Sequence, residues 1–257
     1  MRRLLAVAAL GAALLAACAA PPVRAPVDPA TVPDAVPKVE PRAAYGNPPF
    51  YEVFGERYTV LPTADGHVER GVASWYGPDF HGGRTSSGEP YDMYAMTAAH
   101  KTLPLPAYVR VTNLANGRSI VVRVNDRGPF KKNRIIDLSY VAAARLDMIR
   151  EGTAMVEVVS VGPASSGATS PPAAIARQFY AQAGAFGEET NARRLADRLD
   201  AAGLEGVAVV AARTGGRQLY RVRVGPLDSV AAYDAVVERM RAAGFGEVML
   251  ALDQDRQ

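Results

Sequence analysis

The stretch "AYVRVTNLANGRSIVVRVND", residues 107–126, decides the fold of the first half of the chain. Apolar and polar residues alternate on both sides of Asn116-Gly117, and Asn-Gly is the strongest short-range signal of a two-residue β-hairpin. Residues 71–77 before it and 155–161 after it have the composition of further strands, and residues 140–146 that of one short helix. Many short strands with little helix predict a small closed β-barrel.

The second half of the chain contains an internal repeat. "FYAQAGAF" (179–186) matches "YRVRVGPL" (220–227), and "RLDAAGLEGV" (198–207) matches "RMRAAGFGEV" (239–248), both at an offset of 41 residues. Each half has the pattern strand, helix, strand. Two such halves predict a ferredoxin-like βαββαβ sandwich over residues 178–252, with both helices on one face of the sheet.

Strand alternation divides the residues of this sheet between its two faces. The mostly apolar positions should face the helices: Phe179, Ala181, Ala183, Tyr220, Val222 and Val224. The opposite face should be open to solvent and carry Tyr180, Gln182, Arg221 and Arg223. An aromatic ring beside guanidinium groups could bind RNA or sugar, or the face could simply be solvated. An exported protein without an RNA-binding signature favours sugar.

The first residues have the pattern of a signal peptide. Met1-Arg2-Arg3 precedes an apolar run, residues 4–17, that is too short to span a membrane. The run ends in "LAAC", which resembles a bacterial lipobox and implies that Cys18, the only cysteine, is lipidated. Ala19 and Ala20 follow, which by the same resemblance implies the outer membrane. The alternative is an ordinary signal peptide that happens to contain a cysteine.

Composition separates the two domains and says little about nucleic acid. Of the 257 residues, 49% are hydrophobic and 21% charged, which allows two small cores. Loss of a signal peptide with Arg2 and Arg3 lowers the net charge from +3 to about +1, so nucleic acid is not indicated. Residues 18–48 are rich in Pro and Ala and predict an extended tether, and residues 162–177 a linker. The barrel then occupies residues 49–161.

Two carboxylates stand close together in the sequence at "VNDRGPFKKNRIIDLS" (124–139). Asp126 ends the alternating strand and Asp137 precedes the predicted helix. Asp126 could be only a turn residue before Gly128-Pro129, and Asp137 only a helix cap two residues before Ser139. The alternative is an active site with a pair of acids.

Three stretches together resemble the rare lipoprotein A (RlpA) family: residues 71–105, 108–130 and 134–146, with residues 47–62 before them. The resemblance implies a double-psi β-barrel, the fold shared with expansins and one class of endoglucanase. The C-terminal repeat resembles a SPOR domain, which implies binding to peptidoglycan glycan strands stripped of their stem peptides (denuded strands). Several members of the family are lytic transglycosylases, and others seem only to bind glycan.

The resemblance also suggests roles for particular residues. Asp137 matches the catalytic acid of related barrels, and Asp126 a second acid eleven residues earlier. Glu89 and His100 match polar groups of the RlpA groove that would orient sugar or stabilise positive charge. Lytic cleavage needs a single acid/base, because the 6-hydroxyl of the MurNAc sugar is the nucleophile. A neighbouring carboxylate would raise the pKa of Asp137. Each of the four residues could instead be structural.

Two further questions remain open in the sequence. Trp75 and Tyr76 are adjacent on a strand and point to opposite faces, so one should lie in the core while the other could stack on sugar. One lipidated cysteine and three scattered histidines, His67, His81 and His100, give little support for a metal site, and no cofactor is expected.

The sequence therefore predicts an outer-membrane lipoprotein facing the periplasm and enriched at the division septum. Its barrel would cleave denuded glycan, and its SPOR domain would bind that glycan and meet divisome proteins. The alternatives are a non-catalytic glycan-binding division protein and an inverting glycosidase that uses water.

Overall fold

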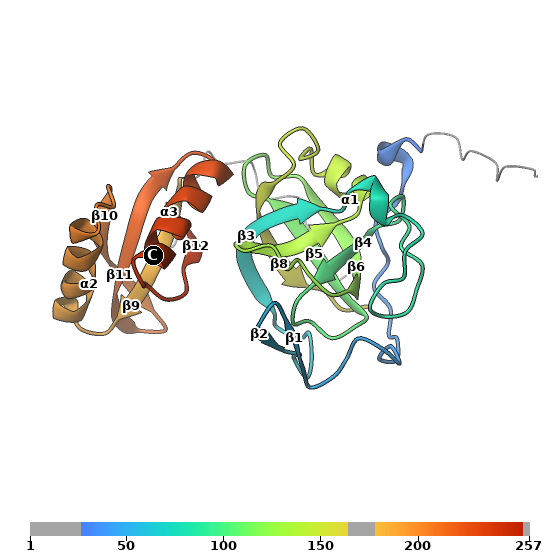
Figure 1. Cartoon of the computed structure of the whole chain (residues 1–257), viewed down its shortest axis with the longest axis horizontal. Helices are drawn as coiled ribbons and strands as arrows, with labels where there is room; N and C mark the ends of the chain where they lie inside the picture. The colour runs from blue at the N-terminus through green and yellow to red at the C-terminus, as the bar shows by residue number, and fades with distance from the viewer. Residues whose placement is uncertain (1–26, 164–177, 254–257) are drawn as a thin grey trace, which may run out of the picture.

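The computed structural model describes residues 27–163 and 178–253, which form a β-barrel followed by an α/β sandwich (Figure 1). The predicted signal peptide, Cys18 and most of the predicted linker lie outside the described residues. Within these two ranges, no helix has the length and apolarity needed to cross a membrane.

Six strands close the barrel. They are β3 (Val68–Trp75), β4 (Thr97–His100), β5 (Ala107–Asn113), β6 (Ser119–Asp126), β7 (Arg134–Leu138) and β8 (Ala154–Ser160). Their order around the barrel is β3-β7-β4-β6-β5-β8. The pairs β3–β7 and β4–β6 are parallel and the others antiparallel. The predicted barrel is therefore confirmed, with strands far apart in sequence side by side.

The predicted hairpin is the pair β5–β6, but its turn is longer than two residues. The strands pair from Ala107 opposite Val124 to Thr112 opposite Ser119, and residues 114–118 form the loop. Gly117 adopts a φ of +75°, which glycine accepts without a steric cost. The amide of Gly117 donates to the carbonyl of Asn113, 2.8 Å away, and this bond closes the wider loop.

One short helix, α1 (Tyr140–Arg145), follows β7. Its N-cap is Ser139, whose side chain accepts a hydrogen bond from the amide of Ala142. Asp137 lies two residues earlier, inside β7, and does not cap the helix. This leaves the carboxylate of Asp137 available for another role.

The segment before the barrel differs from a free tether. From residue 27 to residue 48 the chain includes the 3-10 helix η1 (Pro29–Thr31) and lies against the barrel. Glu40 pairs with Arg123 and accepts a hydrogen bond from Tyr108. Asp34 pairs with Arg145. The composition of this segment predicted that it could not bury a core of its own, and the core it contacts belongs to the barrel.

A small hairpin, β1 (Phe50–Val53) and β2 (Glu56–Thr59), follows, and the 3-10 helix η2 (Pro78–Phe80) comes after β3.

The second domain has the predicted βαββαβ order. Its elements are β9 (Phe179–Phe186), α2 (Glu189–Ala201), β10 (Val207–Thr214), β11 (Arg217–Leu227), α3 (Val230–Ala242) and β12 (Met249–Leu252). The antiparallel sheet has the order β10-β11-β9-β12. Phe179, Ala181, Val222 and Val224 pack with α2 and α3 in one apolar cluster, so the predicted helix-facing set is confirmed.

The opposite face of this sheet is less accessible than the alternation predicted. Tyr180 is 7% exposed and Arg223 only 1%, while Gln182 and Arg221 are half-buried. Arg223 donates to the carbonyl of Leu252 at 3.1 Å and to Oε1 of Gln182 at 3.3 Å, and its guanidinium lies 5.9 Å from the ring centre of Tyr180. These side chains are therefore largely turned toward protein groups instead of water.

The two domains touch through β12, which packs beside β3 of the barrel (Figure 1). Arg134 of β7 is 5% exposed and forms a bidentate ion pair with Asp234 of α3, with N–O distances of 2.9 and 2.8 Å. Val72 and Met155 of the barrel belong to the same apolar cluster as the second domain. An open groove between the domains is lined from both sides, by Lys101 and Lys132 of the barrel and by Gln182 and Arg221 of the sheet.

Candidate active site

Asp126 and Asp137 lie on either side of one residue of the barrel, Ala99. In the parallel pair β4–β6 Ala99 stands opposite Asp126, and in the antiparallel pair β4–β7 it stands opposite Asp137. Two strand spacings separate the acids, which places their Cα atoms about 10 Å apart. Barrel closure therefore brings together the two acids that the sequence singled out.

Asp137 has one hydrogen-bond donor and a largely buried carboxyl. Ser74 of β3 stands opposite it in the parallel pair β3–β7 and donates its hydroxyl to Oδ1. Burial raises the pKa of Asp137, and the charge of Asp126 raises it further, against the hydrogen bond from Ser74 and the positive charges of Arg134 and Lys101. The raised pKa keeps Asp137 protonated to a higher pH than an ordinary carboxyl. The neighbouring acid, which the sequence suggested as the cause, contributes less than burial.

Asp126 has the opposite surroundings. Its Oδ1 accepts hydrogen bonds from the amide and the hydroxyl of Ser86 and from the amide of Arg127, each at 2.7 Å. The hydroxyl of Tyr76 lies 3.3 Å from Oδ2. Donors that point at a carboxylate stabilise its charged form. The two acids thus differ in the number of donors that contact them.

Trp75 and Tyr76 take different roles. Trp75 packs against the barrel core and edge-on against Tyr140. Tyr76 points to Asp126 and packs against Tyr91 and Phe80. Burial and the nearby carboxylates raise the pKa of Tyr76, so its hydroxyl stays protonated and donates. Phe80, whose aromatic ring is 60% exposed beside Tyr76, is a further surface on which sugar could stack.

Glu89 is part of an ion-pair network. Both of its carboxylate oxygens accept from Nη1 of Arg123, at 2.9 and 2.8 Å, and Oε2 also accepts from Asn125. Burial alone would raise the pKa of Glu89, but the hydrogen bonds from Arg123 and Asn125 lower it overall. An ionised, paired carboxylate is a poor proton donor. Glu89 instead ends the turn 85–89, from which Ser86 contacts Asp126.

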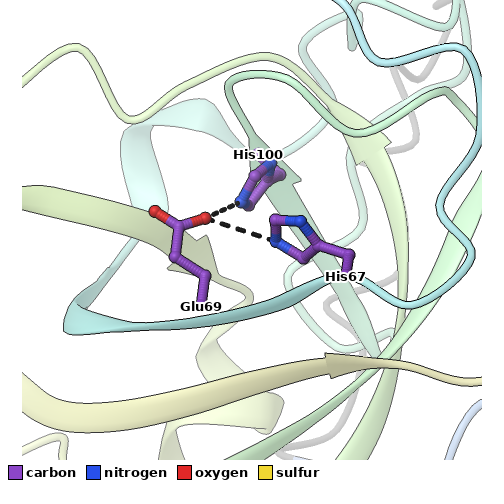
Figure 2. A group of neighbouring side chains, drawn as sticks. All are labelled: His67, Glu69 and His100. Atoms are coloured by element: carbon purple, nitrogen blue, oxygen red, sulfur yellow. Dashed lines mark hydrogen bonds and ion pairs between the residues drawn. The ribbon is translucent and has the colours of Figure 1, made fainter. Parts of the chain in front are cut away.

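His100 is buried and its side chain contacts other groups than the two acids. Its side chain is 2% exposed, and its ring lies against Glu69 and His67, as Figure 2 shows. Its Nε2 is 3.0 Å from Oε2 of Glu69, and its Nδ1 accepts from the amides of Thr102 and Leu103 at 3.2 and 3.1 Å. The expectation of a direct sugar contact therefore does not fit the position of this ring, because strand β4 turns it to the side of β3.

The cluster around His100 contains three side chains of the kinds that bind metal ions. His67, Glu69 and His100 offer ligand atoms within 4.8 Å of one another (Figure 2). The hydrogen bonds of His100 oppose this reading. Two amides donate to its Nδ1, so in the neutral ring the proton is on Nε2, the atom that would have to bind the metal. The cluster fits a hydrogen-bonded group better than a metal site.

The sequence analysis missed several residues that contact the acids. Ser74 and Ser86 each donate to one of them, and Arg127 contributes its amide to Asp126. The guanidinium of Arg127 is bound by the carbonyls of Gly46, His100 and Leu103. Ser86 and Arg127 lie in loops, and Ser74 lies near the end of β3, so none of them carries a periodic signal of its role. Only the register of the closed barrel reveals these contacts.

Comparisons with known proteins agree on both domains. Residues 68–158 match the lytic transglycolase family, and residues 176–251 match the SPOR domain. A Pseudomonas aeruginosa protein named endolytic peptidoglycan transglycosylase RlpA is 47% identical over 179 residues, which cover 68% of this chain and 52% of that one. Proteins of the same name from Vibrio cholerae and Neisseria meningitidis are 56% identical over 130 residues and 49% over 160 residues.

These alignments cover part of each relative. The matched region is 50% of this chain and 49% of the Vibrio cholerae protein, and 62% of this chain and 65% of the Neisseria meningitidis protein. The chain thus spans about half to two thirds of the length of these three relatives. The six-stranded barrel, the βαββαβ domain after it and the sequence identity to three relatives lead to one conclusion: the chain belongs to the RlpA family.

Proposed function

We propose that the barrel is an endolytic transglycosylase that cleaves the MurNAc–GlcNAc bond of peptidoglycan glycan. The observation that carries this proposal is the contrast between two acids on either side of Ala99. Asp137 is largely buried with one donor, and Asp126 is held by donors from Ser86, Arg127 and Tyr76. Burial raises the pKa of Asp137, which suits it to hold the proton that a general acid must donate. The names of the relatives support the same reaction.

The reaction proceeds in two proton transfers at Asp137. The protonated carboxyl donates its proton to the glycosidic oxygen, and the bond from C1 of MurNAc to that oxygen breaks. The carboxylate then takes the proton of the MurNAc 6-hydroxyl, whose oxygen bonds to C1 and closes a 1,6-anhydro ring. No water is consumed, and Asp137 ends protonated as it began.

Asp126 stabilises the positive charge that develops on the sugar ring between the two steps. Its carboxylate keeps a negative charge within the site, and four hydrogen bonds fix its direction. Electrostatic stabilisation by a fixed charge costs little reorganisation during the reaction. A second carboxylate as nucleophile is not needed, because the substrate supplies its own hydroxyl.

Mass spectrometry of glycan after incubation with the protein tests the reaction class. Transglycosylation leaves anhydro-MurNAc ends, and hydrolysis would leave reducing ends 18 mass units, about one water, heavier. Cleavage inside long strands, seen as a broad early distribution of fragments, supports the endolytic mode. Unchanged strands that remain bound to the protein would instead support the alternative of a non-catalytic binder.

The C-terminal domain supplies binding to peptidoglycan, as its match to the SPOR domain supports. We place the binding surface on the sheet face away from the helices, where Gln182 and Arg221 are half-buried and line the groove toward the barrel. Stem peptides would obstruct such a face, so we expect denuded strands to bind better. Titration of the full chain with denuded and peptide-bearing glycan tests this, and equal affinity for both would exclude the proposed specificity.

We further propose that Cys18 is lipidated and anchors the protein to the outer membrane, with enrichment at the division septum. The support is the sequence "LAAC" after the apolar run. Replacing Cys18 by Ser should leave an unprocessed or soluble protein on fractionation. A wild-type protein that is already soluble and carries no lipid would contradict the anchor.

A further inference from the structure

We propose that Glu69 is a positioning residue of the barrel: it holds His100 in the orientation that organises the loop after β4, and this loop seats Arg127 beside Asp126. The successive contacts that connect Glu69 with Asp126 are made by residues other than the two acids. The kinetic part of the proposal rests on the proposed transglycosylase activity, and the structural part stands without it.

The first link joins Glu69 to His100. Glu69 lies on β3, and its Oε2 is 3.0 Å from Nε2 of His100 at the end of β4 (Figure 2). We assign the proton to Nε2, because Nδ1 already accepts two backbone hydrogen bonds and cannot carry one. A proton on Nε2 needs an acceptor in this buried position, and the Glu69 carboxylate is that acceptor. His67 lies 3.3 Å from the same oxygen.

The second link joins His100 to the loop of residues 100–103. The amides of Thr102 and Leu103 both converge on Nδ1, so the imidazole ring acts as the centre of a tight turn. This arrangement leaves three carbonyls of the loop, those of residues 100, 101 and 103, directed to one side. All three lie within hydrogen-bond range of Nη1 of Arg127. The ring of His100 thus shapes the site in which the guanidinium sits.

The third link joins Arg127 to Asp126. The guanidinium is also held by the carbonyl of Gly46, to which Nε donates at 2.8 Å, so the side chain is fixed at both ends of its planar head. The amide of Arg127 donates to Oδ1 of Asp126 at 2.7 Å. Gly128 follows with a φ of +133°, a conformation that commits the backbone to one path. A fixed Arg127 therefore fixes one of the donors that orient the Asp126 carboxylate.

The charged groups around His100 define how the cluster responds to pH. Glu69 and His67 face the ring from the side of β3, and Arg127 faces it from the loop after β6. Burial lowers the pKa of His100, and Glu69 opposes this. Protonation would place a hydrogen on Nδ1 opposite two amide hydrogens, so the loop should open when His100 becomes charged. Glu69 raises the pH at which this happens.

Two substitutions at one position separate the roles of Glu69. Glu69→Gln keeps an oxygen that can accept from Nε2 but removes the charge, and Glu69→Leu removes both. Glu157→Gln is the matched control, because Glu157 is a half-buried carboxylate on the neighbouring strand β8 that pairs with Arg70 at 2.7 Å. In the full chain, amide hydrogen exchange of residues 102 and 103 reports on the loop without any need for activity.

We expect Glu69→Leu to speed exchange at residues 102 and 103 by at least about tenfold and to lower kcat by about 10- to 100-fold with KM little changed, as for a misplaced catalytic group. Glu69→Gln should retain most of kcat and exchange protection, but its activity should extend to lower pH, because the imidazolium loses its counter-charge. Glu157→Gln should change neither quantity.

Three results would overturn the proposal. One is unaltered exchange at residues 102 and 103 in Glu69→Leu; if this variant does not fold, an unshifted acidic limb in Glu69→Gln has the same weight. The second is a proton on Nδ1 of His100 in nitrogen-15 spectra at neutral pH. The third is stoichiometric Zn²⁺ binding by calorimetry that is lost in Glu69→Gln, since this would make the cluster a metal site. Failure of the proposed reaction alone would remove the kinetic readout and leave the exchange and tautomer results to decide.

Discussion

The hydroxyl of Ser74 donates a hydrogen bond to Oδ1 of Asp137 across the parallel pair β3–β7. The two residues are 63 positions apart in the chain, and only barrel closure sets them opposite each other. This bond favours the ionised form of Asp137, while burial of the carboxyl favours the protonated form. Ser74 therefore limits how far the proton affinity of Asp137 rises.

Removing that bond should widen the pH range of activity. In Ser74→Ala, Asp137 loses the hydrogen bond that lowers its pKa, so the pKa rises further. Because the acid must carry a proton, the loss of activity at high pH should move upward by about one pH unit, the size expected for one hydrogen bond to a charge. The measurement is kcat/KM against pH. Ser119→Ala on β6, which removes a hydrogen bond to Thr112, serves as the control and should leave the profile in place. A downward shift in Ser74→Ala would contradict the assigned acid.

Asp137→Asn should abolish anhydro product while the barrel stays folded. The substitution removes a carboxyl that burial disfavours as an ion, so the free energy of unfolding should stay within about 1 kcal/mol of wild type or rise slightly. Trp75, the only tryptophan, lies in the barrel and reports its unfolding by fluorescence. An active Asp137→Asn protein would show that another group donates the proton.

Asp126→Asn should have a different signature from Asp137→Asn. The amide keeps one oxygen for the donors of Ser86 and Arg127 but loses the charge that strengthens those bonds, so we expect a loss of about 1–2 kcal/mol in barrel stability. Loss of the charge also lowers the pKa of Asp137, because the two carboxylates repel each other. Residual activity should therefore disappear at a lower pH on the alkaline side. If Asp126→Asn has the same free energy of unfolding and the same pH profile of activity as the wild type, the charge of Asp126 does not influence Asp137.

Two titrations should each lower barrel stability as acid is added, one beginning below about pH 6.5 and one below pH 4.5. The pKa of His100 is lowered from its ordinary 6.5, so the unfolded chain binds the extra proton first and stability declines once the pH drops below about 6.5. Burial disfavours the Glu69 anion, but hydrogen bonds from His100 and His67 lower its pKa from 4.5 to about 2. Its contribution is complete above pH 4.5 and is lost between 4.5 and about 2.

Urea unfolding followed by Trp75 fluorescence between pH 8 and pH 2 measures both ranges. Glu69→Gln should remove the lower range, since the titrating carboxyl is gone. It should steepen the upper range, because the pKa of His100 is then lowered further. Stability that is flat from pH 7 to pH 5 in the wild type would mean that His100 does not stay neutral in the fold.

In the C-terminal domain, two side chains of the same surface should respond differently to truncation. Gln182→Ala should weaken pull-down by denuded glycan several-fold and leave the domain stable, because Gln182 is half-buried and at the groove. Arg223→Ala should destabilise the domain by about 1–3 kcal/mol, since its guanidinium is 1% exposed and donates to Leu252. Arg217→Ala, at an exposed position of β11, is the control for nonspecific loss of charge. Full binding by Gln182→Ala would move the glycan site elsewhere.

The parts of the fold that depend on local pattern could be predicted from the sequence. The hairpin around Gly117 and the 41-residue repeat are both visible in one dimension, and the repeat even anticipates a contact: Gln182 and Arg223 are repeat-related and pair across β9 and β11. The position of Asp126 at the end of a strand followed from the same alternation. Asp137 was expected just before the helix and lies inside β7 instead, and family resemblance singled out both acids.

Contacts that depend on closure of the barrel or on pairing of charges could not be predicted. Glu69 and His100 are 31 residues apart on strands that are not neighbours in the barrel order, so no periodicity connects them. The segment at residues 27–48 has the composition of a spacer, yet its Glu40 forms an ion pair with Arg123 on strand β6 of the barrel. Exposure of Arg223 was overestimated because alternation assigns a face and says nothing of what lies on it.

The segment that lies along the barrel also limits how far the barrel can extend from the proposed lipid anchor. A spacer that ran freely from Cys18 to residue 48 could extend about 100 Å at 3.3–3.6 Å per residue. The chain contacts the barrel from η1 (Pro29–Thr31) onward, so residues 19–28 separate that contact from the proposed lipid on Cys18, and they can span at most about 40 Å. The proposed anchor would therefore hold the barrel within a few nanometres of the membrane, and the two acids would meet the glycan strands that run closest to that membrane.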